Sequence, residues 1–198
     1  MDQRPDNTLF NLDRKLARRK FFAKSSLFAG AAAFSLTGGS FALASTRATG
    51  LSSGNHTVPL YRLRHNGNTD HFYTTNAKER DDAVKKAGYV YEGIQCYVFS
   101  SQVSDSVPFY RLRHNGSDID HFYTASASER DAAVKKFGYT YEGIQCYVLA
   151  SGNVPLYRLN HSGDADHFYT TDPAELNSAI KKNGYTYEGV AGYVLLHS

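Results

Sequence analysis

The sequence repeats one unit three times over residues 58–198. The segment Val-Pro-(Leu/Phe)-Tyr-Arg-Leu begins at Val58, Val107 and Val154, at spacings of 49 and 47 residues. Asp-His-Phe-Tyr-Thr and Tyr-Glu-Gly also return once in each copy. An open stack of repeats needs atypical, polar end repeats, but here the end copies keep the apolar positions of the middle copy. The pattern therefore predicts three repeats, residues 58–106, 107–153 and 154–198, that close about a pseudo-threefold axis.

Four strands are predicted in each repeat. In the first repeat, alternating apolar and polar residues predict strands over residues 59–64 and 71–75. Two further strands are predicted over residues 89–92 and 94–99, separated by a break at Gly93. Three four-stranded repeats related by threefold symmetry predict a β-rich, β-trefoil-like closed domain. A three-bladed or prism-like closure is the alternative architecture.

One short helix is predicted in the middle of each repeat. A capping residue stands three positions before a glutamate, which is the spacing of a capping box. In the first repeat these are Asn76 and Glu79, with Gly88 placed to end the helix and Ala83-Val84 as a narrow apolar edge. The equivalent residues are Ser126, Glu129 and Gly138 in the second repeat and Asp172, Glu175 and Gly184 in the third.

Composition supports a β-rich fold and disfavours nucleic acid as a partner. The chain has 15 Tyr and 12 Phe but no Trp and one Met, and aromatic residues favour strands. The formal charge of +3 is unevenly divided, because residues 1–44 hold seven Lys/Arg against three Asp and the remainder is slightly acidic. A near-neutral body lacks the basic face that binds DNA or RNA. We therefore expect no nucleic-acid partner, and a monomer.

Residues 1–44 have the features of a twin-arginine signal peptide. Arg18 and Arg19 precede two phenylalanines and a run of twenty uncharged residues that ends in Ala42-Leu43-Ala44, a small-x-small cleavage site. We expect cleavage after Ala44, a linker over residues 45–57, and a secreted or periplasmic bacterial protein that meets the membrane only during export. A retained membrane anchor is the alternative, since twenty uncharged residues are long enough to cross a bilayer.

The repeated motifs resemble a known family. Pro-Leu-Tyr-Arg-Leu, Asp-His-Phe-Tyr-Thr, Glu-Arg-Asp-x-Ala-Val and Gly-Tyr-x-Tyr-Glu-Gly, over residues 58–196, resemble a tyrosine-rich repeat family of unknown function in secreted bacterial and fungal proteins. In that family the repeat often accompanies secreted hydrolases, so the resemblance implies a carbohydrate-binding role. The third copy departs from the pattern at Leu176-Asn177 and Ala191-Gly192, which puts a site in that copy in doubt.

The recurring polar and aromatic residues form a set typical of sugar recognition. Aromatic faces stack on the C–H-rich faces of sugar rings, and Asp, Asn and His bind the hydroxyls. The turns after the first strand are polar, which favours contact with a ligand. We therefore expect a non-enzymatic, lectin-like module that binds a glycan or polysaccharide at up to three equivalent sites, without a cofactor or a metal. The predicted binding residues are His65, Asn66, Asp70, His71 and Tyr73, then His114, Asn115, Asp120, His121 and Tyr123, then His161, Asp166, His167 and Tyr169.

Several alternatives use the same residues. Arg62 with Glu92 also fits a buried ion pair, and His71 also fits a hydrogen-bonded core histidine. Asp70 with Glu92 keeps a glycoside hydrolase open, although threefold repetition argues against a single cleft with one acid and one base of different pKa. A zinc site on the three histidines His71, His121 and His167 is a weaker alternative, because no ligand spacing supports it. An envelope structural or protein-interaction module is the alternative of another class.

The two cysteines occupy equivalent positions in the first two repeats. Cys96 alternates with Ile94 and Val98, which predicts that it points into the core, and Cys146 is its counterpart. An exported chain permits a disulfide between them. A twin-arginine substrate folds before export, however, so its core must be stable with reduced cysteines. We therefore expect two free buried thiols, with the disulfide as the alternative.

Overall fold

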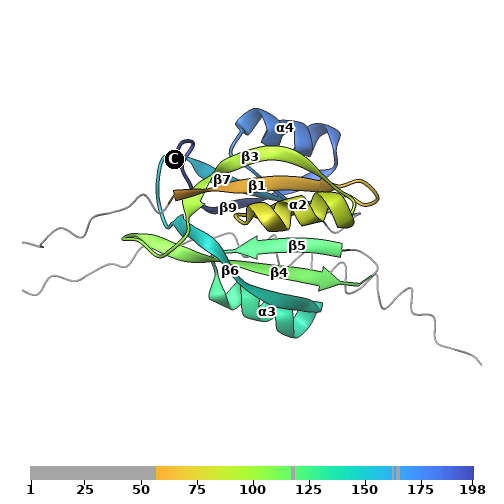
Figure 1. Ribbon diagram of the computed structural model, residues 1–198, viewed down its shortest axis with the longest axis horizontal. Coiled ribbons are helices and arrows are strands. Elements are labelled where there is room, and N and C mark those ends of the chain that lie inside the picture. Colours follow the sequence, from red (N-terminus) through yellow and green to blue (C-terminus); the bar gives the residue numbers. More distant parts are fainter. Residues whose placement is uncertain (1–56, 117–118, 162, 164–165) are drawn as a thin grey trace, which may run out of the picture.

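A computed structural model describes residues 57–116, 119–161, 163 and 166–198 of the 198-residue chain (Figure 1). The predicted signal peptide and all of the predicted linker except Thr57 lie outside these residues. Each repeat has the order strand, strand, helix, strand. The elements are β1 (Thr57–His65), β2 (His71–Thr74), α2 (Ala77–Lys86) and β3 (Tyr89–Phe99); β4 (Ser106–Asn115), β5 (Ile119–Thr124), α3 (Ala127–Phe137) and β6 (Tyr139–Leu149); and β7 (Pro155–His161), β8 (Asp166–Thr170), α4 (Pro173–Lys182) and β9 (Tyr185–Tyr193).

Each repeat is a three-stranded antiparallel sheet with its first strand in the middle. In the first repeat β1 pairs with β2 on one side and with β3 on the other, and α2 connects β2 to β3. The repeats join at the ends of their long last strands, where Phe99 pairs with Tyr147, and Leu149 with Tyr193. The described strands form one sheet of nine, whose path runs β2-β1-β3-β6-β9-β7-β8 with β4 and β5 branching from β6. Figure 1 shows α3 and α4 on opposite sides of the molecule.

The predicted closed β-trefoil is wrong, because the sheet is open and each repeat supplies three strands instead of four. The two strands expected on either side of Gly93 are one continuous strand, β3. Gly93 has a φ of 125°, which residues with a side chain rarely adopt, and the β1–β3 register shifts beside it. The glycine therefore forms a bulge inside the strand, where the sequence pattern suggested a break.

The helix prediction is confirmed at all three N-termini. The Asn76 side chain accepts from the backbone N–H groups of Lys78 and Glu79, and Ser126 and Asp172 cap α3 and α4. The apolar edge is narrower than expected, because only the alanine of each Ala-Val or Ala-Ile pair packs inward. No helix in the described part of the chain is long and apolar enough to span a membrane.

The central core lies where the three repeats meet. Equivalent residues of each repeat contribute to it, including Leu60, Phe109 and Leu156. Cys96 and Cys146 belong to this core and are free and buried, as expected. Burial raises the pKa of the Cys96 thiol to about 12, so this thiol is not reactive near neutral pH. Each repeat adds a smaller apolar cluster of its own.

Candidate functional site

Three predicted binding residues, Tyr73, Tyr123 and Tyr169, form a hydrogen-bonded ring in the central core. The Tyr73 hydroxyl donates to the backbone carbonyl of Tyr169 at 2.8 Å and accepts from the backbone N–H of Tyr169 at 2.8 Å. Tyr123 bonds in the same way to Tyr73, and Tyr169 to Tyr123. Burial raises the pKa of each hydroxyl well above its ordinary value. These side chains hold the repeats together and lie out of reach of a ligand.

The predicted Asp-His pairs are also buried, and they link neighbouring repeats. Asp166 accepts from both the backbone N–H and Nδ1 of His71 at 2.7 Å, and from the Tyr185 hydroxyl at 2.6 Å. Burial, and next the charge of Asp166, raises the pKa of Tyr185. His71 is thus the hydrogen-bonded core histidine that the structural alternative predicted. The equivalent groups are Asp70 with His121 and Tyr89, and Asp120 with His167 and Tyr139.

The three aspartates, and not the three histidines, approach one another. Among the described residues, the group of side chains with a spacing that suits a metal is Asp70, Asp120 and Asp166, whose carboxylate oxygens lie within 4.8 Å of one another. Each carboxylate already accepts from a histidine and a tyrosine. The zinc alternative on the histidines is not supported, because each ring is bonded to an aspartate of a neighbouring repeat.

An arginine on the first strand of each repeat crosses to the helix of the neighbouring repeat. Arg62 donates to both oxygens of Glu175, at 2.9 and 3.0 Å, and its Nε lies 2.8 Å from Glu92 of its own repeat. The guanidinium also lies over the Phe168 ring, 5.3 Å from its centroid. The predicted Arg62–Glu92 pair forms, but it is partly exposed and not buried as expected. We name the boundaries by the repeats they join: boundary 3–1 (Arg62, Glu92, Glu175), boundary 1–2 (Arg111, Glu142, Glu79) and boundary 2–3 (Arg158, Glu188, Glu129).

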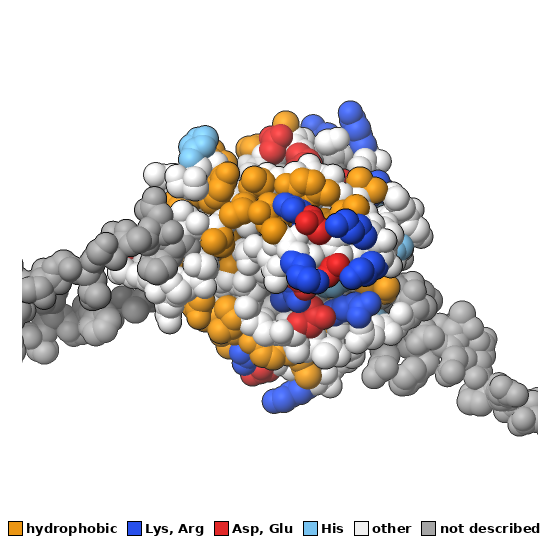
Figure 2. Space-filling model, in the orientation of Figure 1, with side chains coloured by type: hydrophobic (Ala, Val, Ile, Leu, Met, Phe, Trp, Pro, Cys, Tyr) orange, Lys and Arg blue, Asp and Glu red, His pale blue; other side chains and the backbone are white. Residues whose placement is uncertain are grey.

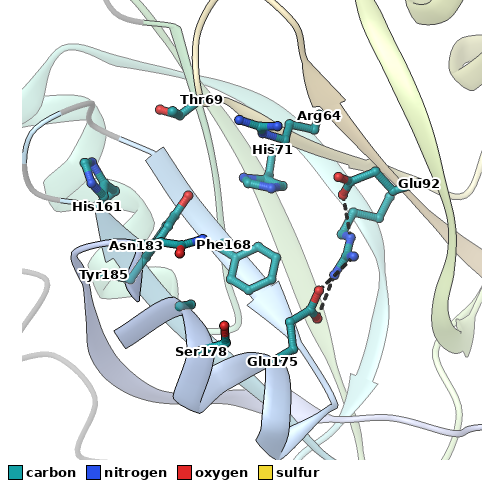
Figure 3. A pocket seen from close by; sticks show the side chains of 12 residues that line it. Arg64, Thr69, His71, Glu92, His161, Phe168, Glu175, Ser178, Asn183 and Tyr185 are labelled. Atoms are coloured by element: carbon teal, nitrogen blue, oxygen red, sulfur yellow. Dashed lines mark hydrogen bonds and ion pairs between the residues drawn. The ribbon is translucent and has the colours of Figure 1, made fainter. Parts of the chain in front are cut away.

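Within the described part of the chain, open clefts lie at boundaries 3–1 and 1–2. The cleft at boundary 3–1 has a volume of about 480 Å³ and holds the Arg62 ion pairs at one end. Figure 3 shows Arg64 beside His71, with the Phe168 ring next to His71. The cleft at boundary 1–2 has a volume of about 380 Å³, and around the neighbouring α2 Figure 2 shows basic and acidic side chains interspersed. Its equivalent lining residues are Arg111, Glu142, Glu79, Arg113, His121 and Phe72.

Boundary 2–3 has the same ion pairs but is closed. The side chains of Arg158 and Glu188 are 5% and 2% exposed, against 16% and 27% for Arg62 and Glu92. Arg158 Nε lies 2.8 Å from Glu188, although its N–H is not aligned for a hydrogen bond. The core of this boundary is therefore sealed from solvent, while its two counterparts are accessible.

Two residues at this boundary differ from their counterparts at the open clefts. Phe137 stands where Ala87 and Asn183 line the open clefts, and it packs against the apolar cluster of the second repeat. Asn160 stands where Arg64 and Arg113 line the open clefts, and its amide lies 3.1 Å from Nε2 of His167. Boundary 2–3 thus has a large ring and a short amide where the open clefts have a smaller residue and an arginine.

Comparison with known proteins adds a family. The model of a domain of unknown function, DUF5648, matches residues 28–149 and 149–195. The chain belongs to the DUF5648 family. No curated protein and no solved structure matches it. The resemblance to a family of unknown function is confirmed to this extent, and the match assigns no chemistry to the clefts.

The predicted turn residues of this DUF5648 chain remain near the surface. His65 Nδ1 accepts from the backbone N–H groups of Gly67 and Asn68, at 3.0 and 3.1 Å, so it organises its turn. His114 accepts in the same way from Gly116. The amides Asn66 and Asn115 are exposed. Among these residues the one that lines a described cleft is His161, at boundary 3–1.

Sequence reasoning missed several cleft residues of the DUF5648 repeats. Glu79 and Glu175 were predicted only as capping-box residues, but their carboxylates bind an arginine of the next repeat. Arg64 and Arg113 carried a usable signal, because the first two repeats read Arg-Leu-Arg-His where the third reads Arg-Leu-Asn-His. Phe137 carried a similar signal, since it replaces a small residue before the glycine that follows the helix.

Proposed function

We propose that this protein is an exported, non-enzymatic carbohydrate-binding module whose ligand sites are the two open clefts at boundaries 3–1 and 1–2. The observation that carries the proposal is that one set of Arg, Glu, His and Phe residues lines an accessible cleft twice. Of the up to three sites expected from the sequence, we propose these two.

The chemistry of the clefts suits a saccharide. A sugar offers many hydroxyls, which donate and accept, together with C–H-rich ring faces. At boundary 3–1 the Ser178 hydroxyl, the Asn183 amide and the Arg64 guanidinium supply polar partners, while Phe168 and Tyr185 supply aromatic edges. A volume of about 480 Å³ lies within the range of small-molecule sites. Two such sites on one chain would raise avidity for a polymer.

The carboxylates of the clefts support binding over catalysis. A glycosidase needs one carboxylic acid whose pKa is raised, so that it can protonate the leaving group. Burial alone would raise the pKa of Glu79, but hydrogen bonds from Arg111 and Thr74 outweigh it and lower this pKa below its ordinary value. Glu79 is therefore suited to hold Arg111 and not to donate a proton.

Export is the second part of the proposal, and it is supported by the sequence of residues 1–44. The twin-arginine pair is recognised by a receptor, so charge alone does not replace it. Replacing Arg18 and Arg19 together by Lys should leave uncleaved precursor in the cytoplasm, whereas the unaltered chain should yield a secreted or periplasmic protein that begins near Ser45. Fractionation and N-terminal analysis check this, and normal export of the double variant would contradict it.

A broad glycan array with the exported, folded protein tests the binding function. The expected result is binding of a saccharide class without its hydrolysis, at two sites per chain by titration calorimetry. Ala87→Phe and Asn183→Phe each place a phenylalanine in one open cleft, at the position that Phe137 occupies in the second repeat. Each variant should therefore block one cleft and reduce the stoichiometry to one ligand per chain. Absence of binding to every glycan would overturn the proposal, and an envelope protein captured without competition by sugar would favour the interaction module instead.

A further inference from the structure

Each open cleft is lined by a histidine with one ring nitrogen that makes no hydrogen bond within the described residues. His71 and His121 are 7% and 6% exposed, and the Nδ1 atom of each is bonded to an aspartate. No hydrogen bond within the described residues occupies their Nε2 atoms, and both histidines line a cleft. At boundary 2–3 the Asn160 amide bonds the equivalent atom of His167. Because the Nε2 atoms of His71 and His121 are not bonded within the described residues, they can accept a hydrogen bond from a ligand in each open cleft.

The same end of each cleft carries an arginine. Arg64 lines the cleft at boundary 3–1, and Figure 3 shows its guanidinium beside the His71 ring. Within the described residues no carboxylate pairs with Arg64, in contrast to Arg62, which two glutamates hold. Arg113 occupies the equivalent place at boundary 1–2. Each open cleft therefore has one arginine whose donors remain available to a ligand.

These two groups define complementary partners. A guanidinium pairs best with a carboxylate, through two parallel N–H···O bonds. Because Nδ1 of His71 is directed at Asp166, the neutral ring presents Nε2 as an acceptor, which suits a hydroxyl group. Glu92 and Glu175, which pair with Arg62, would repel a second anion. We therefore expect the carboxylate of a ligand at Arg64.

We infer that the two clefts bind an acidic saccharide, of the uronic acid type, whose carboxylate pairs with Arg64 or Arg113 and whose neighbouring hydroxyl donates to His71 or His121. This inference rests on the proposed carbohydrate-binding function and names the class of sugar. Boundary 2–3 takes no such ligand, because Asn160 replaces the arginine and occupies the histidine.

The test uses uronic acid oligosaccharides beside the same oligosaccharides after reduction of their carboxylates to primary alcohols. The exported, folded protein should bind the acidic form at least about tenfold more tightly, at two sites. Arg64→Gln and Arg113→Gln should each weaken one site by about tenfold or more, and the double variant should weaken both. Lys135→Gln, an exposed change on α3 away from the clefts, is the matched control and should leave binding unchanged.

The outcomes separate the two proposals. Equal binding of the acidic and reduced forms, unchanged in the double variant, would overturn the acidic class while the carbohydrate-binding function stands. Binding of sulfated but not carboxylated oligosaccharides would overturn the uronic acid assignment. Absence of all saccharide binding would remove both proposals. If the double variant fails to fold by circular dichroism, Arg64→Lys with Arg113→Lys keeps the charge without the paired geometry, and retention of full affinity by it would overturn the bidentate contact.

Discussion

At boundary 2–3 Arg158 and its two glutamates are buried, while at boundary 3–1 Arg62 and its two glutamates face a cleft. The contacts are the same and the surroundings differ. Among the residues outside the ion pairs, Phe137 and Asn160 differ from their counterparts at boundary 3–1. A repeat protein can thus keep an identical structural interface three times and still change which copies accept a ligand.

The largest expected effect is the loss of the buried arginine. Arg158→Leu should lower the free energy of unfolding by about 3–5 kcal/mol, because Glu129 and Glu188 would remain buried without a partner. Arg62→Leu should cost about 1 kcal/mol, since solvent screens the glutamates that it leaves behind. Urea denaturation of both variants checks this, and equal losses would contradict the distinction between the two boundaries.

In contrast to the arginines, the three tyrosines of the ring should contribute equally to the free energy of unfolding, because their surroundings are equivalent. Replacing Tyr73, Tyr123 or Tyr169 by Phe removes the partner of one buried backbone N–H and one carbonyl. Each variant should lose about 2–3 kcal/mol of unfolding free energy, with similar values for all three. Chemical denaturation measures them side by side. A loss of stability confined to one tyrosine would show that the three repeats differ in the central core as well as at their boundaries.

Truncation of the Phe137 side chain tests how far it stabilises boundary 2–3. Phe137→Ala should cost about 1–2 kcal/mol, less than a fully buried phenylalanine, because Phe137 is only partly buried. The reverse change, Ala87→Phe, adds a ring at an exposed position and should leave the unfolding free energy within about 0.5 kcal/mol of the parent. Thermal unfolding compares the two. If Phe137→Ala lowers the free energy of unfolding by no more than Ala87→Phe changes it, Phe137 does not stabilise boundary 2–3.

Local signals predicted the helices well but not the strand count. Asn76, Glu79 and Gly88 are close in sequence and determine the helix by their own backbone bonds. Gly93 is compatible with both a break and a bulge, and only its pairing with β1 decides for the bulge. The sequence also did not indicate which glutamates pair with each arginine. Arg62 was matched with Glu92 of its own repeat, but three equivalent copies leave open which repeat supplies the second glutamate.

The sequence predicted the types of residue in the candidate site better than it predicted where they lie in the fold. Of the predicted binding residues, Asp70, just before β2, and Tyr73, on β2, are buried, because in each repeat they bond to residues of a neighbouring repeat. His71 is shared between the core and a cleft, since its two ring nitrogens face different surroundings. No spacing within one repeat indicates that a cleft forms between two repeats, so Arg64 was overlooked.

The smallest expected effect is a dependence on pH at the open boundary 1–2. Hydrogen bonds from Arg111 and Thr74 lower the pKa of Glu79 below its ordinary value of 4.5, despite the burial that opposes this shift. The ionised form therefore stabilises the folded state above pH 4.5, and this contribution is lost as the pH falls through the lowered pKa. The Glu79 side chain is 37% exposed, so its contribution should be about 0.5–1 kcal/mol at neutral pH.

Glu79→Gln measures this contribution, because the amide keeps the shape of the side chain and cannot ionise. The difference in unfolding free energy between the parent and Glu79→Gln should be present at pH 7 and shrink in acid, while the exposed control Lys135→Gln should differ little from the parent throughout. A difference that grows as the pH falls would reverse the sign argued for Glu79. A difference in unfolding free energy above about 3 kcal/mol at pH 7 would show that the ion pair of boundary 1–2 contributes as much as a buried one, although its cleft is open.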